Sequence, residues 1–199
     1  MSIKITDLYK SFGNNNVLAG VNLCLKDNSV YCLMGASGMG KTTLLRIIMQ
    51  LEKSDAGSIE GADLKDISVM FQEDRLCDVL TPVENVVLVC EKNVSRKKIY
   101  DNLCKILPKE CLIQPVSELS GGMKRRVALA RAMEYPGKIV IMDEPFTGLD
   151  YNTKKEVIGY ILQQKRDRIM FISTHGEEDA SLLGAVKIKL EDINNICGV

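Results

Sequence analysis

The chain has 199 residues, of which 46% are hydrophobic and 26% are charged, so it is long enough to bury the core of one globular domain. Basic and acidic residues both number 26, and the resulting formal net charge of zero excludes the bulk basicity typical of nucleic-acid-binding proteins. No apolar run approaches the length needed to span a bilayer, and the N-terminal MSIKITDLYKSF lacks the apolar core of a signal peptide. We therefore expect a cytoplasmic protein that reaches a membrane only through a partner.

The first part of the chain is predicted to form strands around one helix. Strands are expected over residues 3–5, 17–25 and 30–34, with the turn residues GNNN between the first two. A helix is expected over 41–51, because apolar residues recur at helical spacing at Leu44, Leu45, Ile47, Ile48 and Leu51. Short strands follow at 58–60 and 67–71.

The middle of the chain is mostly helical in pattern, and strands and helices then alternate. Helices are expected over 82–91, 96–107 and 122–134. The last part predicts a strand over 139–142, a helix over 152–166, a strand over 169–173, a short helix, and a strand over 186–190. Such alternation favours an α/β sheet, and strands on both sides of the helical middle indicate a lobe inserted into one core.

The seven cysteines are scattered and form no CxxC pair, and the chain has a single histidine. A structural metal site would need clustered ligands, so this pattern gives no support for one. Apolar or amphipathic surroundings predict buried, reduced thiols at Cys24, Cys32, Cys90 and Cys104.

A glycine-rich stretch lies between an expected strand and an expected helix. It fits GxxxxGK[ST], the P-loop pattern, in which glycines let backbone N–H groups converge on phosphate oxygens. The helix start adds its positive dipole end, Lys41 supplies a cation to the outer phosphates, and Thr42 offers a hydroxyl to Mg²⁺. The P-loop alone does not choose between kinases, GTPases and motor ATPases. The residues expected to bind nucleotide are Gly35, Ala36, Ser37, Gly38, Met39, Gly40, Lys41, Thr42 and Thr43.

Two adjacent carboxylates follow the apolar strand expected over 139–142. The C-terminal ends of strands are where α/β sheets place their ligands. Asp143 is suited to hold Mg²⁺, directly or through water, and Glu144 can polarise a water molecule aimed at the γ-phosphate. The alternative is a pair of surface acids at the end of a strand.

A second glycine-rich stretch, LSGGM, precedes a predicted helix. Ser120 can cap that helix, and Gly121 and Gly122 leave its N-terminal N–H groups open to a phosphate; the alternative is a capped helix without a ligand. LSGGM resembles the signature motif of ATP-binding cassette (ABC) ATPases. In that family two cassettes sandwich two ATP molecules, each between one subunit's P-loop and the other's signature. The family motif usually ends in glutamine, so the resemblance extends to Ser120, Gly121 and Gly122 but not to Met123.

The resemblance covers nearly the whole chain and implies roles for four further residues. Phe12 in KSFG matches the aromatic residue that stacks on adenine, with a core aromatic as the alternative. Gln72 in MFQED matches the Q-loop glutamine that reaches Mg²⁺ and water, with a turn glutamine as the alternative. Asp150 in TGLD matches the D-loop across the dimer interface and is also suited to cap the next helix. His175 in STH matches the switch histidine that contacts the γ-phosphate.

The family implies an α/β fold, namely a P-loop NTPase core with an N-terminal antiparallel β subdomain and an inserted α-helical lobe. We expect one ABC ATPase domain over 1–199, with the lobe over 73–135. The implied activity is hydrolysis of ATP with Mg²⁺ as cofactor. Catalytic roles are expected for Glu144, His175 and Gln72, and metal binding for Thr42, Gln72 and Asp143.

A lone, compact cassette resembles the ATPase subunit of a multi-subunit prokaryotic transporter, most similar to the nitrate/sulfonate/taurine importer group. The sequence ends soon after His175, so we expect no second cassette or regulatory domain. The implied partners are a transmembrane permease, a second cassette in an ATP-dependent homodimer or cassette pair, and an extracellular substrate-binding subunit, with no nucleic acid. The protein would lie on the inner face of the membrane. An exporter cassette, for lipoprotein or drug efflux, and a non-transport ATP-driven clamp remain alternatives.

Two surface features complete the predictions. Lys124, Arg125 and Arg126 follow the signature, and we interpret them as a solvated helix face rather than a nucleic-acid site, because RRVALARAM interleaves basic and apolar residues. In the family, a groove beside the segment after Gln72 receives a permease helix. Leu76, Val79 and Leu80 are therefore candidates for a docking surface, and packing inside the lobe is the alternative.

Overall fold

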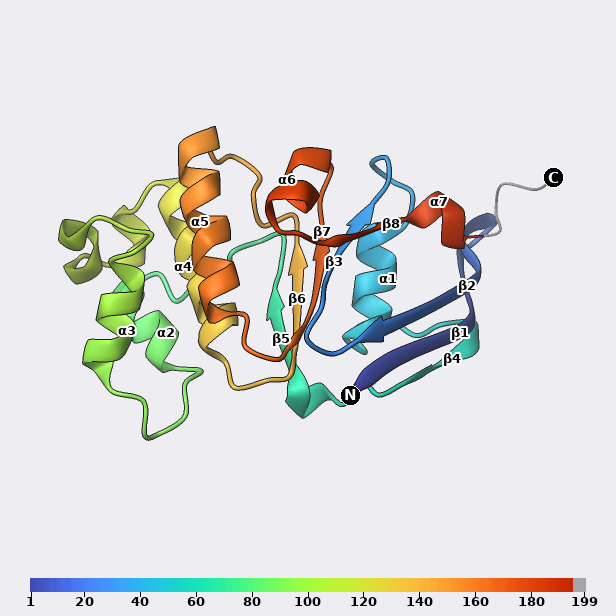
Figure 1. Cartoon of the computed structure of the whole chain (residues 1–199), viewed down its shortest axis with the longest axis horizontal. Coiled ribbons are helices and arrows are strands. Elements are labelled where there is room, and N and C mark those ends of the chain that lie inside the picture. The colour runs from blue at the N-terminus through green and yellow to red at the C-terminus, as the bar shows by residue number, and fades with distance from the viewer. Residues whose placement is uncertain (195–199) are drawn as a thin grey trace.

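The computed structural model of the chain describes residues 1–194, which form two β-sheets with helices around them (Figure 1). The larger sheet has five parallel strands in the order β5-β6-β7-β3-β8. The smaller sheet is antiparallel, in the order β2-β1-β4. The predicted α/β class, with an antiparallel sheet built from the N-terminal strands, is confirmed.

Strands and helices follow one another along the chain much as the apolar patterns predict. The strands are β1 (Ser2–Phe12), β2 (Asn15–Lys26), β3 (Val30–Met34), β4 (Ala56–Glu60), β5 (Ile67–Met70), β6 (Ile139–Asp143), β7 (Ile169–Ser173) and β8 (Val186–Lys189). The α-helices are α1 (Lys41–Ile48), α2 (Pro82–Val87), α3 (Arg96–Leu103), α4 (Gly121–Glu134), α5 (Tyr151–Gln164), α6 (Glu177–Leu182) and α7 (Leu190–Ile193). Short 3₁₀ turns are η1 (Leu64–Asp66), η2 (Lys109–Ile113) and η3 (Val116–Glu118).

The central strands separate two hydrophobic clusters, because successive residues of a strand point to opposite faces. In β6, Ile139 and Ile141 pack in one cluster with α1 and the antiparallel sheet. Val140 and Met142 pack in the other cluster, with α4 and α5. Both faces of the parallel sheet are thus covered, which explains why its strands read as continuous apolar runs.

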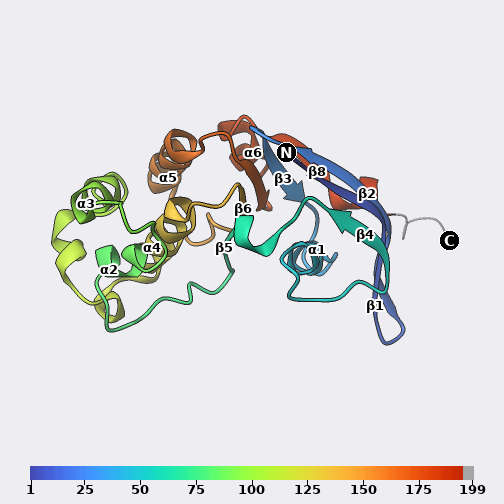
Figure 2. The same cartoon turned by 90° about the horizontal axis from the view of Figure 1, so that it is seen from below.

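Helices α2 and α3 lie at the end of the molecule opposite the antiparallel sheet (Figures 1 and 2). Their buried residues Val86, Ile99 and Leu103 belong to the same cluster as Val140 of the sheet. The helices of the middle segment therefore share a continuous core with one face of the sheet.

The first predicted helix ends three residues early, so Leu51 lies outside it. Helix α1 stops at Ile48, Gln50 takes a positive φ of 56°, and Leu51 is 49% exposed. The N–H of Leu51 donates to the carbonyl of Arg46 at 2.8 Å, which closes the end of the helix. This turn rotates Leu51 out of the apolar stripe that its spacing suggested.

Several other element ends also differ from the predictions; β1 runs to Phe12 rather than to residue 5, and α5 ends at Gln164 rather than 166. Helix α2 ends at Val87 rather than 91, and α3 ends at Leu103 rather than 107. Beyond these ends, the N–H groups of Val89, Cys90, Lys105 and Ile106 bond three residues back instead of four. The final strand stops at Lys189, and the short helix α7 follows. Within residues 1–194, no helix is long and apolar enough to cross a membrane.

The cysteine prediction is correct for one residue and wrong for another. Cys32 is fully buried in β3, and burial raises the pKa of its thiol to about 12. Cys90 and Cys104 are half-buried. Cys24 is exposed, because it lies on the outer face of β2 opposite Lys4, and the antiparallel sheet buries its other face.

Candidate active site

The carboxyl ends of four parallel strands meet at one edge of the larger sheet. Strand β3 leads into the P-loop, and Gln72 follows two residues after β5. Strand β6 ends at Asp143 and β7 ends at Ser173, two residues before His175. Because these strands are parallel neighbours, residues far apart in sequence are brought to the same edge.

The P-loop conformation depends on glycine. Gly38 and Gly40 have φ values of +81° and +100°, a region that other residues rarely adopt. Gly40 caps the N-terminus of α1, so the loop leads directly into the positive end of the helix dipole. The Lys41 ammonium donates to the carbonyls of Gly35 at 2.7 Å and Ala36 at 3.0 Å, so it lies against the loop.

The Asp143 carboxylate joins the P-loop helix to β7. Its Oδ2 accepts a hydrogen bond from Thr42 Oγ1 at 3.0 Å, and its Oδ1 accepts one from Ser173 Oγ at 2.5 Å. Asp143 is only 6% exposed, so its carboxylate oxygens depend on these donors for hydrogen bonds. The structure thus brings the predicted metal-binding residues Thr42 and Asp143 together.

The oxygen atoms of Thr42 and Asp143 suit a small hard cation as metal ligands. A hydroxyl and a carboxylate are oxygen ligands of the kind that Mg²⁺ accepts, with nucleotide phosphates and water filling other positions. Among residues 1–194, no group of three or more histidine, cysteine, aspartate and glutamate side chains could hold a metal ion by itself. The ion would therefore depend on the phosphates as well as on Thr42 and Asp143.

Glu144 and His175 form a close pair. His175 Nε2 lies 2.5 Å from Glu144 Oε1, and the side chains are 48% and 20% exposed respectively. Glu144 has a φ of +50°, which is strained for a residue with a side chain. Its N–H donates to Ser173 Oγ at 2.9 Å and to the Ser173 carbonyl at 3.2 Å, which helps to hold that conformation.

A cavity of about 230 Å³ lies beside the P-loop and Glu144, and neither Asp143 nor His175 is among the residues that line it. Phe12 borders it from the end of β1 and is 49% exposed, so the alternative of a core aromatic is wrong. Gln72 also borders it and is exposed. The full lining is Phe12, Val17, Ser37, Gly38, Gly40, Lys41, Thr42, Thr43, Gln72 and Glu144.

The predicted signature residues do not line this cavity. Ser120 caps α4, and its Oγ accepts a hydrogen bond from the N–H of Met123 at 3.3 Å. Ser120 and Gly121 are exposed. The Met123 sulfur lies 3.8 Å from Cys111 Sγ, so this side chain packs into the helical part of the molecule. The chain therefore carries a second open helix start, apart from the P-loop.

Asp150 caps α5, as its position before NTKKE predicts. Its Oδ1 accepts hydrogen bonds from the N–H groups of Asn152 at 3.0 Å and Thr153 at 3.1 Å, and its Oδ2 accepts one from Thr153 Oγ1 at 2.6 Å. The Thr153 hydroxyl and these N–H groups lower the pKa of the Asp150 carboxyl. The same turn approaches the signature, since a Cβ on Gly122 would lie 3.7 Å from Leu149.

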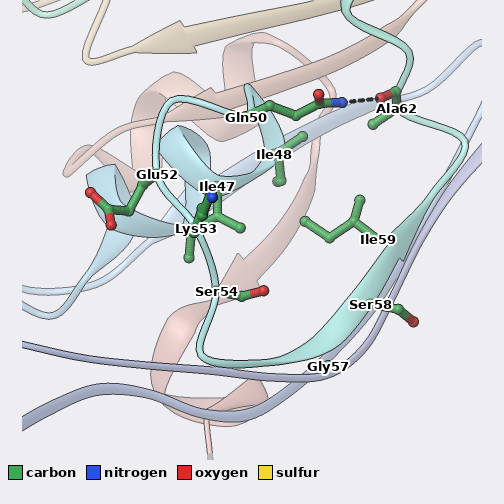
Figure 3. Close-up of a pocket in the computed structure, with 10 residues that line it drawn as sticks. All are labelled: Ile47, Ile48, Gln50, Glu52, Lys53, Ser54, Gly57, Ser58, Ile59 and Ala62. Atoms are coloured by element: carbon green, nitrogen blue, oxygen red, sulfur yellow. Dashed lines mark hydrogen bonds between the residues drawn. The ribbon is translucent and has the colours of Figure 1, made fainter.

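A larger hollow of about 510 Å³ lies at the other end of α1 (Figure 3). Ile48 and Ile59 point into it, and a hydrogen bond from Gln50 Nε2 to the Ala62 carbonyl, 3.1 Å long, spans one end. Glu52 on its rim is neutralised by Lys10 at 2.9 Å. None of the predicted site residues lines this hollow, so the smaller cavity at the sheet edge is the candidate active site.

Comparison with known proteins decides the family. The family model described as ABC transporter matches residues 18–147. The chain belongs to the ABC transporter family. This cassette is accordingly an ATPase that binds ATP with Mg²⁺, and the cavity described above lies beside its P-loop.

Relatives of the cassette are named as import ATP-binding proteins. It is 36% identical over 208 residues to the probable sulfate/thiosulfate import ATP-binding protein CysA of Chlorella vulgaris, covering 96% of this chain and 88% of that one. It is 36% identical over 200 residues to the CysA protein of Mannheimia succiniciproducens, covering 90% of this chain and 56% of that one. It is 36% identical over 195 residues to the spermidine/putrescine import ATP-binding protein PotA of Legionella pneumophila, covering 89% and 53%. The chain thus spans about half the length of these two bacterial relatives.

Solved structures support the same fold. A dimeric bacterial ABC transporter cassette matches with a TM-score of 0.80 and 26% identity, covering 94% of both chains. A putative ABC transporter ATP-binding protein from Pyrococcus furiosus matches with a TM-score of 0.84 and 25% identity, covering 98% of this chain and 100% of that one.

Sequence reasoning missed Arg125, and its interpretation as part of a solvated face is wrong. Arg125 is 6% exposed, and its guanidinium lies among backbone carbonyls beneath the active site. Ser173 was also missed, although it orients Asp143. Arg125 follows directly after Lys124 and precedes Arg126, so the run of basic residues masked its inward position.

Proposed function

We propose that the cassette is the ATP-binding and ATP-hydrolysing subunit of a transporter that imports a small solute. ATP-driven dimerisation of two cassettes would be coupled to movement of a membrane permease. The observation that carries this proposal is the meeting of Thr42, Asp143 and Glu144 beside the P-loop, with a separate signature helix start on the same chain. The import direction is supported by the names of the relatives.

The P-loop is proposed to bind the phosphates through its backbone N–H groups, with Lys41 neutralising the outer phosphates. Thr42 and Asp143 would hold Mg²⁺, and Gln72 would reach the same ion and the attacking water. Phe12, exposed at the cavity rim, would stack on the adenine. The ion supplies charge stabilisation to the transferred phosphoryl group.

Glu144 and His175 are proposed to act on hydrolysis itself. The Glu144 carboxylate would polarise a water molecule and orient it toward the γ-phosphate. His175, 2.5 Å from that carboxylate, would contact the γ-phosphate and keep Glu144 oriented. Ser173 supports both by holding the Glu144 backbone and the Asp143 carboxylate.

Ser120, Gly121 and Gly122 are proposed to contact the nucleotide of a second cassette. The exposure of Ser120 and Gly121 at a capped helix start, away from the chain's own cavity, supports this role. Asp150 would lie in the same interface, in addition to capping α5. We also propose that residues 1–199 form one ABC ATPase domain in which 73–135 is the inserted helical lobe.

The partners and location follow from the same proposal. A transmembrane permease would hold the cassette on the inner face of the membrane, and an extracellular substrate-binding subunit would deliver the solute. Similarity to the nitrate/sulfonate/taurine group stays a prediction for the finer assignment, while the relatives named above transport sulfate, thiosulfate or polyamines according to their names. No nucleic acid is expected as a partner.

Val79 is the best candidate for the permease surface. It is 83% exposed, whereas Leu76 and Leu80 are half-buried. Leu76 packs against the core of the helical part. The Leu80 carbonyl accepts a hydrogen bond from the N–H of Val116 at 2.9 Å, which anchors the segment next to Val79. An exposed apolar side chain on an anchored segment suits a protein contact.

Two alternatives stay open and make different predictions. An exporter cassette would also associate with a permease, but solute would leave the ATP-containing side. A non-transport clamp would dimerise with ATP without any membrane subunit. The identity of the co-purifying membrane protein separates both from the import proposal.

The test is purification of the tagged cassette from membranes, followed by reconstitution with its membrane subunit in vesicles. ATP on the cassette side should drive solute toward that side, and Glu144→Gln should stop transport while leaving the complex assembled. Solute movement in the opposite direction would establish export. Recovery of the cassette without any membrane subunit would contradict the proposal.

The docking surface has its own test. Val79→Asp should prevent co-purification with the permease but leave ATP binding and the melting temperature unchanged, because Val79 is exposed. Leu64→Asp is the matched control, since Leu64 is an apolar residue 53% exposed in η1, outside the helical middle of the chain. A Val79→Asp cassette that assembles and transports normally would refute this docking surface.

A further inference from the structure

Arg125 lies in the second turn of the signature helix α4 and points inward. It is 6% exposed, although it is flanked by two other basic residues. Its Nη1 donates to the carbonyls of Phe71 at 3.0 Å and Gln72 at 2.7 Å, and to the Asp74 carboxylate at 3.1 Å. One guanidinium nitrogen thus fixes the segment that carries the predicted Q-loop glutamine.

The other nitrogen of the same guanidinium binds a different strand end. Nη2 donates to the carbonyls of Asp143 at 2.8 Å and Glu144 at 2.7 Å. Glu144 has a strained φ of +50°, and its N–H is bound by Ser173, so its backbone is held on both sides. Arg125 is well suited to this task because its planar fork presents donors in fixed directions.

No neighbouring basic residue makes the same bridge. Arg126 donates to the carbonyls of Gly122 at 3.1 Å and Ile106 at 2.6 Å, so these contacts stay within the helical part. Arg131 donates to the carbonyls of Arg75 at 2.8 Å and Asp74 at 3.0 Å, so it holds the Q-loop segment only. Arg125 alone among these three reaches both the Q-loop segment and the end of β6.

We propose that Arg125 is a positioning residue that couples the signature helix to the two groups acting on the attacking water, Gln72 and Glu144. Ser120 caps the same helix. A displacement of α4 when its N-terminus meets the partner cassette's nucleotide is therefore transmitted through Arg125 to the backbone of both groups. Hydrolysis in each cassette thus depends on whether its own signature is occupied. This inference rests on the proposed role of the signature in an ATP sandwich.

The kinetic test compares Arg125→Gln, Arg125→Lys and the control Arg126→Gln in the intact cassette. Neither Gln nor Lys reproduces the two-pronged fork, so kcat per folded molecule should fall between about 10- and 100-fold, the cost of misplaced reacting groups. The affinity for ATP–Mg²⁺ and KM should change by less than about threefold, because the P-loop contacts are intact. Arg126→Gln should keep the wild-type kcat.

The effect of a positioning residue on kcat can be distinguished from a loss of stability. A purely structural role would lower the melting temperature and the folded fraction, yet leave kcat per folded molecule unchanged. Arg125→Lys keeps the buried cation, so it should fold even where Arg125→Gln does not. A folded Arg125→Lys cassette that hydrolyses ATP at the wild-type rate would overturn the proposal.

Amide hydrogen exchange gives a readout that does not depend on hydrolysis. Arg125→Lys should accelerate exchange about tenfold in both 71–75 and 143–144, whereas Arg131→Gln should affect only the first segment. Unchanged exchange at 143–144 would refute the bridge. If the bridge is intact but wild-type cassette neither dimerises nor hydrolyses ATP, the proposed function fails and the positioning contact stands.

Discussion

Gly40 illustrates how much of the site depends on a single backbone position. Its φ is +100°, and a Cβ there would lie 2.6 Å from Val17 Cγ1 and 3.2 Å from the Val17 carbonyl oxygen. Gly38, two residues earlier, has a φ of +81° but open space around its Cβ position. A side chain at Gly38 would therefore meet only dihedral strain, whereas a side chain at Gly40 would meet dihedral strain and a steric conflict.

Gly40→Ala should be more destabilising than Gly38→Ala. Both substitutions bring the strain of a left-handed conformation, about 1–2 kcal/mol. Gly40→Ala adds a steric conflict with Val17, for which overpacking costs about 1–3 kcal/mol more. Urea unfolding of the two variants measures the difference. Equal free energies of unfolding would show that the loop adjusts freely around Gly40.

At the scale of elements, α5 has a charged N-cap and a glycine that neither its φ nor its packing requires. Asp150 accepts hydrogen bonds from Asn152 and Thr153 at the helix start. Gly159 lies within the helix, without a positive φ and with nothing within 4 Å of its Cβ position. The two positions allow the helix to be weakened at one point and strengthened at another without touching the cavity.

Gly159→Ala should stabilise the cassette by about 0.5–1 kcal/mol, because alanine reduces the entropy of the unfolded chain and fits the helix. Chemical denaturation should show a higher midpoint with an unchanged slope. ATPase activity should be unaffected. A lower midpoint would contradict the open space around the Cβ position of Gly159.

The Asp150 cap should contribute a pH-dependent part of stability. Its folded pKa is lowered by the Thr153 hydroxyl and the helix N–H groups. A lowered folded pKa means that the stabilisation is complete above the unfolded pKa, about 3.9, and is lost as the pH falls through the lower folded value. Asp150→Asn keeps a cap that does not titrate. The melting temperature of the wild type relative to Asp150→Asn should therefore drop only below about pH 4, and a constant difference down to pH 2 would contradict the assignment.

At the scale of the whole molecule, the proposed signature site favours assembly of two cassettes. The P-loop cavity and the signature helix start are separate, and Gly122 lies close to Leu149 in the turn before Asp150. A solved relative is described as a dimeric cassette. Nucleotide that binds between two cassettes stabilises the dimer by mass action.

Glu144→Gln should convert the cassette into an ATP-dependent dimer. The substitution preserves shape but removes the carboxylate proposed to orient water, so ATP persists. Size-exclusion chromatography with light scattering should show monomers without nucleotide and dimers with ATP–Mg²⁺. Ser120→Arg added to Glu144→Gln should abolish the dimer by blocking the signature. A dimer that forms without nucleotide, or survives Ser120→Arg, would argue against the sandwich.

The chemistry-bearing motifs could be predicted because each depends on a few neighbouring residues. Local spacing is enough to recognise GxxxxGK[ST] between a strand and a helix, and two carboxylates after an apolar strand. Continuous apolar runs likewise predicted strands of the parallel sheet, because both of its faces are covered. The antiparallel sheet was implied by the family resemblance. The ends of α1, α2 and α3 could not be predicted well, because single turns there depend on which carbonyl each N–H meets.

The sequence by itself determined the fold class, the P-loop, the acidic pair at the end of β6 and the signature, because local order places these groups. Only the tertiary structure decided that Thr42, Asp143 and Ser173 form one hydrogen-bonded group, that Phe12 is exposed at the cavity, and that Arg125 is buried. Arg125 shows the reason most clearly. Its acceptors lie 18 to 54 residues away along the chain. The basic residues next to it in the sequence therefore predict exposure to solvent, whereas in the folded chain its guanidinium meets backbone carbonyls.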